Sequence, residues 1–399
     1  MLVRRTYARL AAVIVVALGL AAGLGLTATA QAATSTLGDH VNSTYQTNGR
    51  VYAIVPVPDT DTVYIAGDFT SVRPAGAAAG TQEVPRARLA AFRISTGALL
   101  PWNPGADKSV FALAASPDGQ TVYAGGNFVK IGGVGRKHMA AVDALTGTAK
   151  PFKADTDYNV RAIAVSALQV YFGGHFTTVN GVPRSRLAAV DPATGTLRGT
   201  WTPSADNEVR AITLSPDGTS VYVGGDFSSI NGSTAQKRLA KLSTLDGSPQ
   251  AWTTHPGYPI HQIIVTTSAV FVGGDGSGGH AGSYSPAGVK GWVTQTDGGV
   301  QAIALLDGML YVGGHFDNVC VGDTSGATTG FHCPTTSATR HKLLAVDPAN
   351  GSLDAWNPGA NSNLGVWSLA SSDRLHVGGD FTTIGHYHAQ QGYATFSPS

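Results

Sequence analysis

Charged residues are scarce in this sequence of 399 residues. Asp, Glu, Lys and Arg together make up 13% of the chain, and the formal net charge at pH 7 is +1. Because there is no excess of positive charge, nucleic acid and anionic membrane surfaces are not expected as partners. Glycine, by contrast, is abundant at 51 residues, and 43% of the chain is apolar. This composition excludes a disordered chain and a long helical bundle, and it favours short strands and tight turns around a sizeable core.

Standard catalytic signatures are also missing. The sequence contains no G-x-S-x-G elbow, no H-E-x-x-H pair, no phosphate-binding glycine loop and no pairing of a histidine with a free thiol. Acidic pairs occur at Asp59 with Asp61 and at Asp155 with Asp157, but both stand at turns, where aspartate is favoured for backbone reasons. No cofactor or metal is therefore expected. Catalysis stays open, because a site assembled from distant segments leaves no linear motif.

The N-terminus carries the pattern of an export signal. Three arginines precede an apolar run over residues 11–26, and small residues follow up to Ala32. This pattern predicts a signal peptide over residues 1–32, cleavage after Ala32 and a secreted protein without stable membrane insertion. A membrane anchor is disfavoured because the apolar run is short. Export by the general or by the twin-arginine route remains open.

Cysteine occurs only twice, at Cys320 and Cys333. In an exported chain oxidation is the default, so these two residues are expected to form a disulfide. Closing so short a loop should stabilise the fold by about 3 kcal/mol through chain entropy. A metal site would need more ligands than two thiols.

One motif recurs along the whole chain after the signal segment. A strand-like sequence of the type VYxGG is followed by Asp, Asn or His and, in most copies, by Phe, about every 52 residues. The Asp, Asn or His position falls at Asp68, Asn127, His175, Asp226, Asp275, His315 and Asp380.

Each repeat is expected to form four antiparallel strands. An apolar segment such as residues 160–166 comes first, a tight turn such as residues 116–119 leads to the VYxGG strand, and a segment such as residues 186–191 supplies the third strand. A short strand bearing an aromatic residue completes the unit. These features predict an all-β fold, a seven-bladed β-propeller that forms a single domain over residues 33–399. Since the last repeat ends after its third strand, residues 33–50 are expected to supply the missing outer strand and close the ring.

The sequence here resembles a known family. The repeated GG[DHN]F strand, followed by a strand of the RLAAVD type, is similar to the delta-60 repeat, a β-propeller repeat of uncharacterised function that is common in exported bacterial proteins. The resemblance covers residues 51–399, although the fifth repeat departs from it because Gly276 replaces the phenylalanine. It implies a propeller fold and an extracellular setting, and it implies no activity.

The recurring Asp, Asn or His position could form a ring of ligands, but a residue present in every repeat more often serves a structure that every repeat shares. A polar tie to the position that opens the third strand is therefore expected. That position holds Arg88, His138, Arg186, Arg238 and Lys342. The recurring aromatic residues are expected to pack between blades rather than to form a carbohydrate platform.

The longest insertions lie between the second and third strands of the first, sixth and seventh repeats, over residues 71–86, 317–341 and 383–391. These connections share one face, and the three repeats are neighbours in a closed ring, so the insertions should gather over one part of that face, the loop-face sector. Its candidate binding residues are Arg73, Gln82, Glu83, Asp323, His332, Arg340, His341, His386, Tyr387 and His388. Two of these, His386 and His388, could form half of a metal site or could be two solvated histidines.

These observations predict a monomeric exported binding module that recognises a glycan, a peptide or a protein through the loop-face sector. The alternative is a secreted carbohydrate-active enzyme, a polysaccharide hydrolase or lyase, with its site at the channel mouth on the same face. A cluster of carboxylates with raised pKa values in the channel would favour the enzyme.

Overall fold

The computed structural model describes residues 34–252, 254–322, 331, 333 and 336–398. The predicted signal peptide over residues 1–32 lies outside these residues. The described chain consists of short β-strands and one 3₁₀ turn at Pro58–Thr60, which confirms the all-β prediction. Within this part of the chain, no helix is long and apolar enough to cross a membrane.

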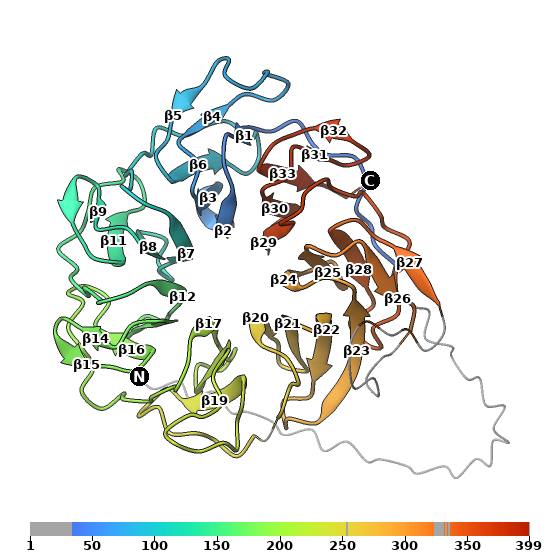
Figure 1. Ribbon diagram of the computed structural model, residues 1–399. Helices are drawn as coiled ribbons and strands as arrows, with labels where there is room; N and C mark the ends of the chain where they lie inside the picture. The colour runs from blue at the N-terminus through green and yellow to red at the C-terminus, as the bar shows by residue number, and fades with distance from the viewer. Residues whose placement is uncertain (1–33, 253, 323–330, 332, 334–335, 399) are drawn as a thin grey trace, which may run out of the picture. The chain divides into compact units, whose positions relative to one another are not determined.

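Small antiparallel sheets stand around a common centre (Figure 1). Five of these sheets have three strands each, which pair in the order in which they occur along the chain. The first sheet consists of β2 (Val51–Val57), β3 (Thr62–Gly67) and β6 (Leu89–Arg93), and the second of β7 (Val110–Ala115), β8 (Thr121–Gly126) and β11 (Met139–Asp143). The other three are β12 (Val160–Val165), β13 (Val170–Gly174) and β16 (Leu187–Val190); β17 (Val209–Leu214), β18 (Ser220–Gly225) and β19 (Leu239–Ser243); and β24 (Val300–Leu306), β25 (Met309–Gly314) and β28 (Leu343–Val346). A further one contains β29 (Val366–Ser371), β30 (Leu375–Gly379) and β33 (Tyr393–Phe396).

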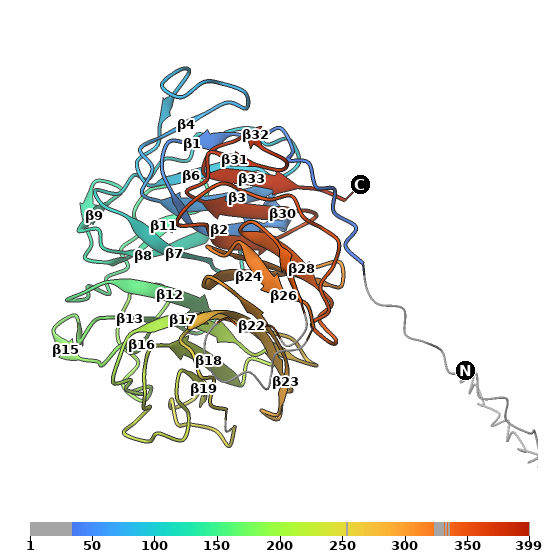
Figure 2. The ribbon, with the colours of Figure 1, turned by 45° about the vertical axis from the view of Figure 1, so that its right-hand side comes forward.

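The fifth repeat forms a larger sheet, in which β20 (Ile260–Val265), β21 (Val270–Gly276), β22 (Gly278–Tyr284) and β23 (Lys290–Thr296) pair in sequence. The first strand of every sheet lies innermost and contacts the first strand of the next one, and β29 contacts β2 (Figures 1 and 2). The inner strands therefore form a closed circle, the arrangement of a β-propeller.

The outer strands are shorter than predicted. Outside β23 they make only single bridges to the third strand, for example between Val190 and Leu197. The recurring aromatic residue lies beyond this bridge rather than on the strand, as Trp201 shows, and only Trp292 stands on a full outer strand. Trp201 is buried, and its indole N–H donates to the carbonyl oxygen of Ser243 in the next sheet at 3.0 Å. The aromatic residues thus pack between neighbouring sheets, as expected.

The recurring glycine pair is required by the close approach of neighbouring strands. A Cβ on Gly173 would lie 2.5 Å from Cγ1 of Val209 in the next sheet, and a Cβ on Gly174 would lie 2.1 Å from the carbonyl oxygen of Asn159. Equivalent contacts occur at the glycine pairs of β8, β18, β21, β25 and β30. Because any side chain there would collide with backbone or with a branched side chain, the VYxGG motif marks where sheets touch.

The position that opens the third strand has a left-handed backbone. Its φ angle is +71° at Arg88, +66° at His138, +68° at Arg186, +63° at Arg238 and +70° at Lys342. At Arg186 this geometry lets the backbone N–H donate to the carbonyl of Phe176 at 3.0 Å and lets the carbonyl accept from Gly174 at 3.1 Å. Within the described residues, no hydrogen bond joins the side chains of this series to those of the Asp, Asn or His series. At Arg88 the guanidinium donates instead to the backbone carbonyl oxygen of Asp68 at 2.6 Å, so the polar tie at that repeat uses the backbone of the Asp, Asn or His position.

An Asp or Asn ahead of each inner strand holds the connection that follows the second strand, except in the fifth sheet. Oδ1 of Asp157 accepts from the backbone N–H groups of Thr177 at 2.7 Å and Thr178 at 2.9 Å. The same pair of bonds is made by Asn48, Asp107, Asp206, Asp297 and Asn361. Asp157 is therefore more than a turn residue, because it joins the segment before the first strand of its sheet to the segment after the second strand.

Acid should weaken the fold through these carboxylates. Burial alone would raise the pKa of Asp107, Asp157, Asp206 and Asp297, but the N–H donors outweigh it and lower each pKa below the ordinary 3.8. A carboxyl whose pKa is lower in the folded state stabilises it above its unfolded pKa, and this contribution is lost as the pH falls through the folded value. We expect the free energy of unfolding, measured in urea from neutral pH to about pH 2, to fall below about pH 4. An acid slope that is unchanged in Asp157→Asn would contradict this.

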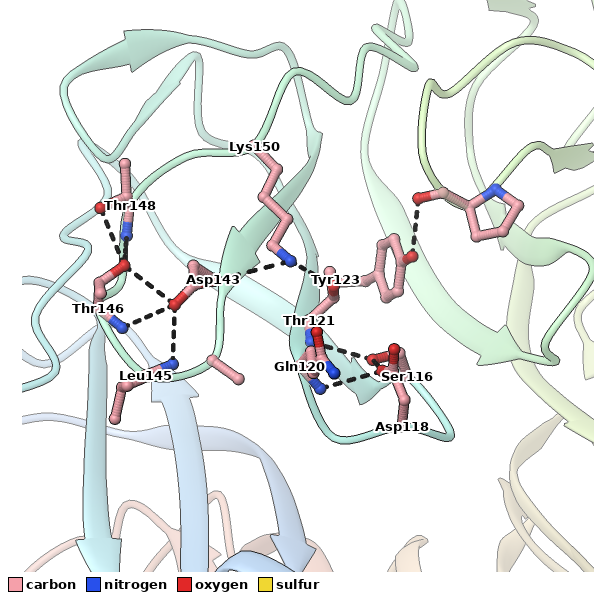
Figure 3. A network of polar contacts seen from close by, with 12 residues as sticks. Ser116, Asp118, Gln120, Thr121, Tyr123, Asp143, Leu145, Thr146, Thr148 and Lys150 are labelled. Carbon is pink, nitrogen blue, oxygen red and sulfur yellow. Dashed lines mark hydrogen bonds and ion pairs between the residues drawn. The ribbon is translucent and has the colours of Figure 1, made fainter.

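The face opposite the insertions is built from tight turns (Figure 3). In the second sheet Asp118 accepts the backbone N–H of Gln120 at 3.0 Å, and Asp143 accepts that of Thr146 at 2.9 Å. The ammonium group of Lys150 donates to Oγ1 of Thr121 at 2.9 Å, which joins the two turns. These side chains serve the turns themselves, so this face offers short and internally satisfied loops.

The N-terminal segment pairs with the last strand. Leu37 forms an antiparallel bridge with Pro398, the N–H of Gly38 donates to the carbonyl of Ser397 at 3.0 Å, and that of Asn42 donates to Thr395 at 2.9 Å. The segment lies along the outer edge of β33.

Candidate functional site

The three long insertions form hairpins that follow one another around the rim (Figure 1). They are β4 (Ser71–Arg73) with β5 (Val84–Pro85), β26 (Asn318–Cys320) with β27 (Ser337–Thr339), and β31 (Thr383–Ile384) with β32 (His388–Ala389). Each hairpin also pairs with the chain that leaves the preceding sheet. Arg73 pairs with Gln46 in β1 (Gln46–Thr47), Val319 pairs with Thr296, and Ile384 pairs with Ala360. Every insertion is thus anchored to two sheets.

The disulfide prediction is confirmed. Cys320 and Cys333 are bonded, with their Cα atoms 5.0 Å apart. Asp323 and His332, two candidate binding residues of the same insertion, lie outside the described residues.

Some of the candidate residues support loops instead of facing a ligand. Arg73 is only 4% exposed, and its guanidinium donates to the side-chain oxygens of Gln46 and Gln391 at 3.1 and 2.8 Å. Arg340 donates to the carbonyl oxygens of Thr339 and Asp354, both at 2.9 Å. These two arginines therefore join segments of the fold.

The candidates of the first insertion lie apart from the others. Gln82 is exposed, with a left-handed φ of +51°. Glu83 accepts hydrogen bonds from the hydroxyl of Ser71 and the N–H of Gly80, and these donors lower its pKa. Glu83 therefore stabilises the loop to which it belongs.

Three of the candidates meet in one pocket. His341, from the sixth repeat, and His386 and Tyr387, from the seventh, line a cavity of about 410 Å³. Its wall is completed by Asp317, Lys342, Asn357, Pro358, Gly359, Ala360, Asn361, Ser362, Asn363 and Thr383. His388 is exposed on β32 beside this cavity's hairpin but does not line it. We call this cavity the rim pocket.

An ion pair between the buried Lys342 and the half-exposed Asp317 organises one wall of the rim pocket. Oδ1 of Asp317 accepts from Nζ of Lys342 at 2.7 Å and lies 2.8 Å from Nδ1 of His341. Burial would raise the pKa of Asp317, but the hydrogen bonds and charges of these two partners lower it. Oδ2 of Asp317 has no donor among the described residues, so one acceptor remains for a ligand.

The opposite wall is held by the N-terminal segment. Nε2 of His386 lies 2.6 Å from Oδ2 of Asp39, and the rings of His386 and His40 are 5.4 Å apart. This contact orients His386. In the described part of the chain, no group of three side chains could hold a metal ion.

A second cavity lies on the axis of the ring, and none of the predicted binding residues lines it. In each inner strand the register with the second strand shifts by one residue, as between Val160 and Ala162. The extra residue, here Arg161, is turned out of the regular alternation by this β-bulge. The bulged residues are Tyr52, Phe111, Arg161, Arg210, His261, Gln301 and Trp367, and all of them line a cavity of about 400 Å³.

The lining of this channel is asymmetric. Trp367, Tyr52 and Phe111 form an aromatic arc, with ring centroids 5.5 and 5.4 Å apart. Arg161 stacks over Phe111 at 4.2 Å and bonds Glu208 at 3.1 Å. The channel therefore joins three aromatic rings on one side to ionic groups on the other.

Several members of the Asp, Asn or His series contact these bulged residues. Asp226 accepts from Arg210 at 2.7 and 2.9 Å, Oδ2 of Asp68 accepts from the hydroxyl of Tyr52 at 3.2 Å, and Asp275 lies 3.0 Å from Nε2 of His261. Burial would raise the pKa of Asp275, but its bond to His261 and the nearby positive groups lower it.

The remaining members of the series have other partners. Nε2 of His315 accepts the N–H of Gly299 at 3.0 Å, and the ring of His175 lies 5.1 Å from that of Tyr158. Asp380 accepts from Ser362, whereas Oδ1 of Asn127 is buried without a partner in the described chain. The members of the series thus have different contacts and do not form a ring of equivalent ligands.

Comparison with known proteins supports the architecture. No family model and no curated protein matches the chain. Among solved structures it is similar to one described as the crystal structure of RRP9 WD40 repeats, with 14% identity, a TM-score of 0.55, and coverage of 92% of this chain and 99% of the other. It is also similar to one described as the structure of U3-55K, with 14% identity, a TM-score of 0.55, and coverage of 90% and 98%. At this identity the likeness shows the fold alone, and that fold is a WD40-like β-propeller.

Proposed function

We propose that this chain is an exported, monomeric binding module of the delta-60 type, a seven-bladed propeller over residues 33–399 whose last blade is completed by residues 33–50. Removal of residues 1–32 would release it outside the cell. Its ligand is a glycan, a peptide or a protein that contacts the loop-face sector. β-Propellers commonly act as interaction scaffolds, which agrees with this assignment.

The rim pocket is the observation that carries the proposal. Two insertions that are far apart in the sequence place His341, His386 and Tyr387 around one cavity of about 410 Å³, a size typical of ligand sites, which span ~300–1,000 Å³. Asn357 and Asn363 are exposed there, and neither amide has a hydrogen-bond partner among the described residues. Unpartnered amides on anchored loops suit recognition of an external molecule.

The enzyme alternative has weaker support. A hydrolase of the common two-carboxylate type needs one carboxyl with a raised pKa to act as general acid. At the channel, Asp275 has a lowered pKa, and Glu208 and Asp226 are held by Arg210 at 3.3 and 2.7 Å. This geometry favours binding over hydrolysis.

The test is a binding screen with protein recovered from the culture medium, whose first residue should be close to Ala33. Immobilised oligosaccharides and peptides would be probed with the parent and with Asn357→Ala and Asn363→Ala. Because these side chains are exposed and unpartnered, we expect an unchanged melting temperature and a loss of affinity of about tenfold.

The matched control is Leu145→Ala, a change at a side chain that is 85% exposed in a turn of the opposite face. It should retain full binding. If the control abolishes binding while both asparagine variants retain it, the ligand contacts the other face and the proposal fails.

A further inference from the structure

The hairpin of the seventh repeat contains an unusual turn. Gly385, His386 and Tyr387 have successive φ angles of +64°, +56° and +67°. In three other repeats the same hairpin turns through only two such residues, which are Gly132–Gly133, Asn180–Gly181 and Asn231–Gly232. Glycine and asparagine are the residues that tolerate this conformation best. The seventh repeat instead inserts one residue and places two large side chains there.

Tyr387 gains no compensating contact from the fold. A left-handed backbone brings Cβ close to a carbonyl oxygen, which disfavours any residue other than glycine and makes it unusual for a bulky one. His386 has a partner in Asp39, at 2.6 Å. Tyr387 is 82% exposed, and in the described chain its ring packs on no other ring and its hydroxyl has no hydrogen-bond partner. Strain that the fold does not offset is typical of a residue held for function.

The rim pocket below this ring combines polar groups with apolar wall atoms, and its charged side chains are paired. Lys342 is neutralised by Asp317, and His386 is bonded to Asp39. The groups left for a ligand are the free oxygen of Asp317 and the exposed amides of Asn357 and Asn363. These atoms can both accept and donate hydrogen bonds. Such a surface suits a neutral molecule that carries many hydroxyl groups.

We propose that the rim pocket binds a neutral carbohydrate and that the ring of Tyr387 is the platform on which one sugar ring stacks. A sugar ring presents C–H groups on its face and hydroxyls at its edge, so the aromatic face can contact the first while the amides and Asp317 bind the second. This inference rests on the proposed function and names its ligand class.

The first measurement is affinity by calorimetry, with neutral cello-, laminari-, manno- and chito-oligosaccharides as probes at up to millimolar concentration. We expect at least one to bind the parent. Tyr387→Phe and Tyr387→Trp should keep the affinity within a few-fold, whereas Tyr387→Ala should lose at least about tenfold.

The second measurement is thermal stability without ligand. Tyr387→Gly should abolish binding and raise the melting temperature by about 2 °C, because glycine relieves the left-handed strain. A lowered melting temperature would assign Tyr387 to folding and overturn the proposal. Binding of none of the oligosaccharides, or binding that Tyr387→Ala leaves intact, would also overturn it.

The two proposals fail separately. If only peptides bind, and Asn363→Ala weakens that binding, the carbohydrate inference is wrong while the binding function of the rim pocket stands. If a ligand binds equally well to the Asn363→Ala and Tyr387→Ala variants, the rim pocket is not the binding site and both are wrong.

Discussion

Deletion of residues 34–42 should destabilise the propeller by about 4 kcal/mol or more, since it removes several hydrogen bonds and one buried leucine. The segment covers β33 through Leu37, Gly38 and Asn42, and Asn42 also donates through its side chain to Thr395 and Ser397 at 3.1 and 2.9 Å. Its loss would expose an unpaired strand edge, which also favours aggregation. Thermal melting of the purified truncation measures the effect.

Single substitutions in the same segment give smaller stability losses with which the effect of the deletion can be compared. Leu37→Ala removes a side chain that is 6% exposed, and Asn42→Ala removes two side-chain bonds without exposing the strand edge. Each should cost about 1 to 3 kcal/mol, less than the deletion. A truncation that melts at the same temperature as the parent would show that the segment does not close the ring.

Gly174→Ala should be the most damaging single substitution, with a loss of about 3 kcal/mol or more, or failure to fold. Its new Cβ would lie 2.1 Å from the carbonyl oxygen of Asn159 and 3.0 Å from Cα of Val160. Both are backbone atoms of the inner strand, so neither can move without disturbing the contact between neighbouring sheets. The free energy of unfolding in urea measures the change.

Gly199→Ala is the matched control. Gly199 belongs to the same repeat, has no left-handed φ, and has no atom within 4 Å of an added Cβ. The alanine variant should be as stable as the parent or slightly more stable, because alanine restricts the unfolded chain. If both variants unfold alike, close packing is not the reason for the glycine pair.

Much of the architecture could be predicted because the same strand and turn patterns recur in many repeats. The segments 160–166 and 186–191 correspond to β12 and β16, and the glycine pair marks the contact between sheets. The outer strand was harder to predict, because a single bridge such as that between Val190 and Leu197 imposes no alternation on the sequence. The aromatic residue was the visible signal there, and it lies beyond the bridge.

The candidate site was predictable only in part. Insertion length pointed to the loops around His341, His386 and Tyr387, which do line one pocket. It could not separate them from Arg73, because a buried arginine and an exposed one look alike in a sequence. The channel residues were missed for another reason: a β-bulge turns one residue such as Arg161 without changing the apolar pattern of its strand. Aligning the repeats would have revealed this position, since it varies among Tyr, Phe, Arg, His, Gln and Trp within a largely apolar segment.

The pairing of Leu37 with Pro398 has a mechanical consequence. Because the two segments run antiparallel, the chain enters and leaves this pair at the same end, next to Leu37 and Pro398. Tension applied to both ends would break the hydrogen bonds one after another, first the bond to Ser397 and then the bond to Thr395, and would separate the segment from β33. The same pair resists heat as a unit, because thermal unfolding must break all its contacts together. A closure of this kind therefore yields more readily to tension between the two ends of the pair than to heating.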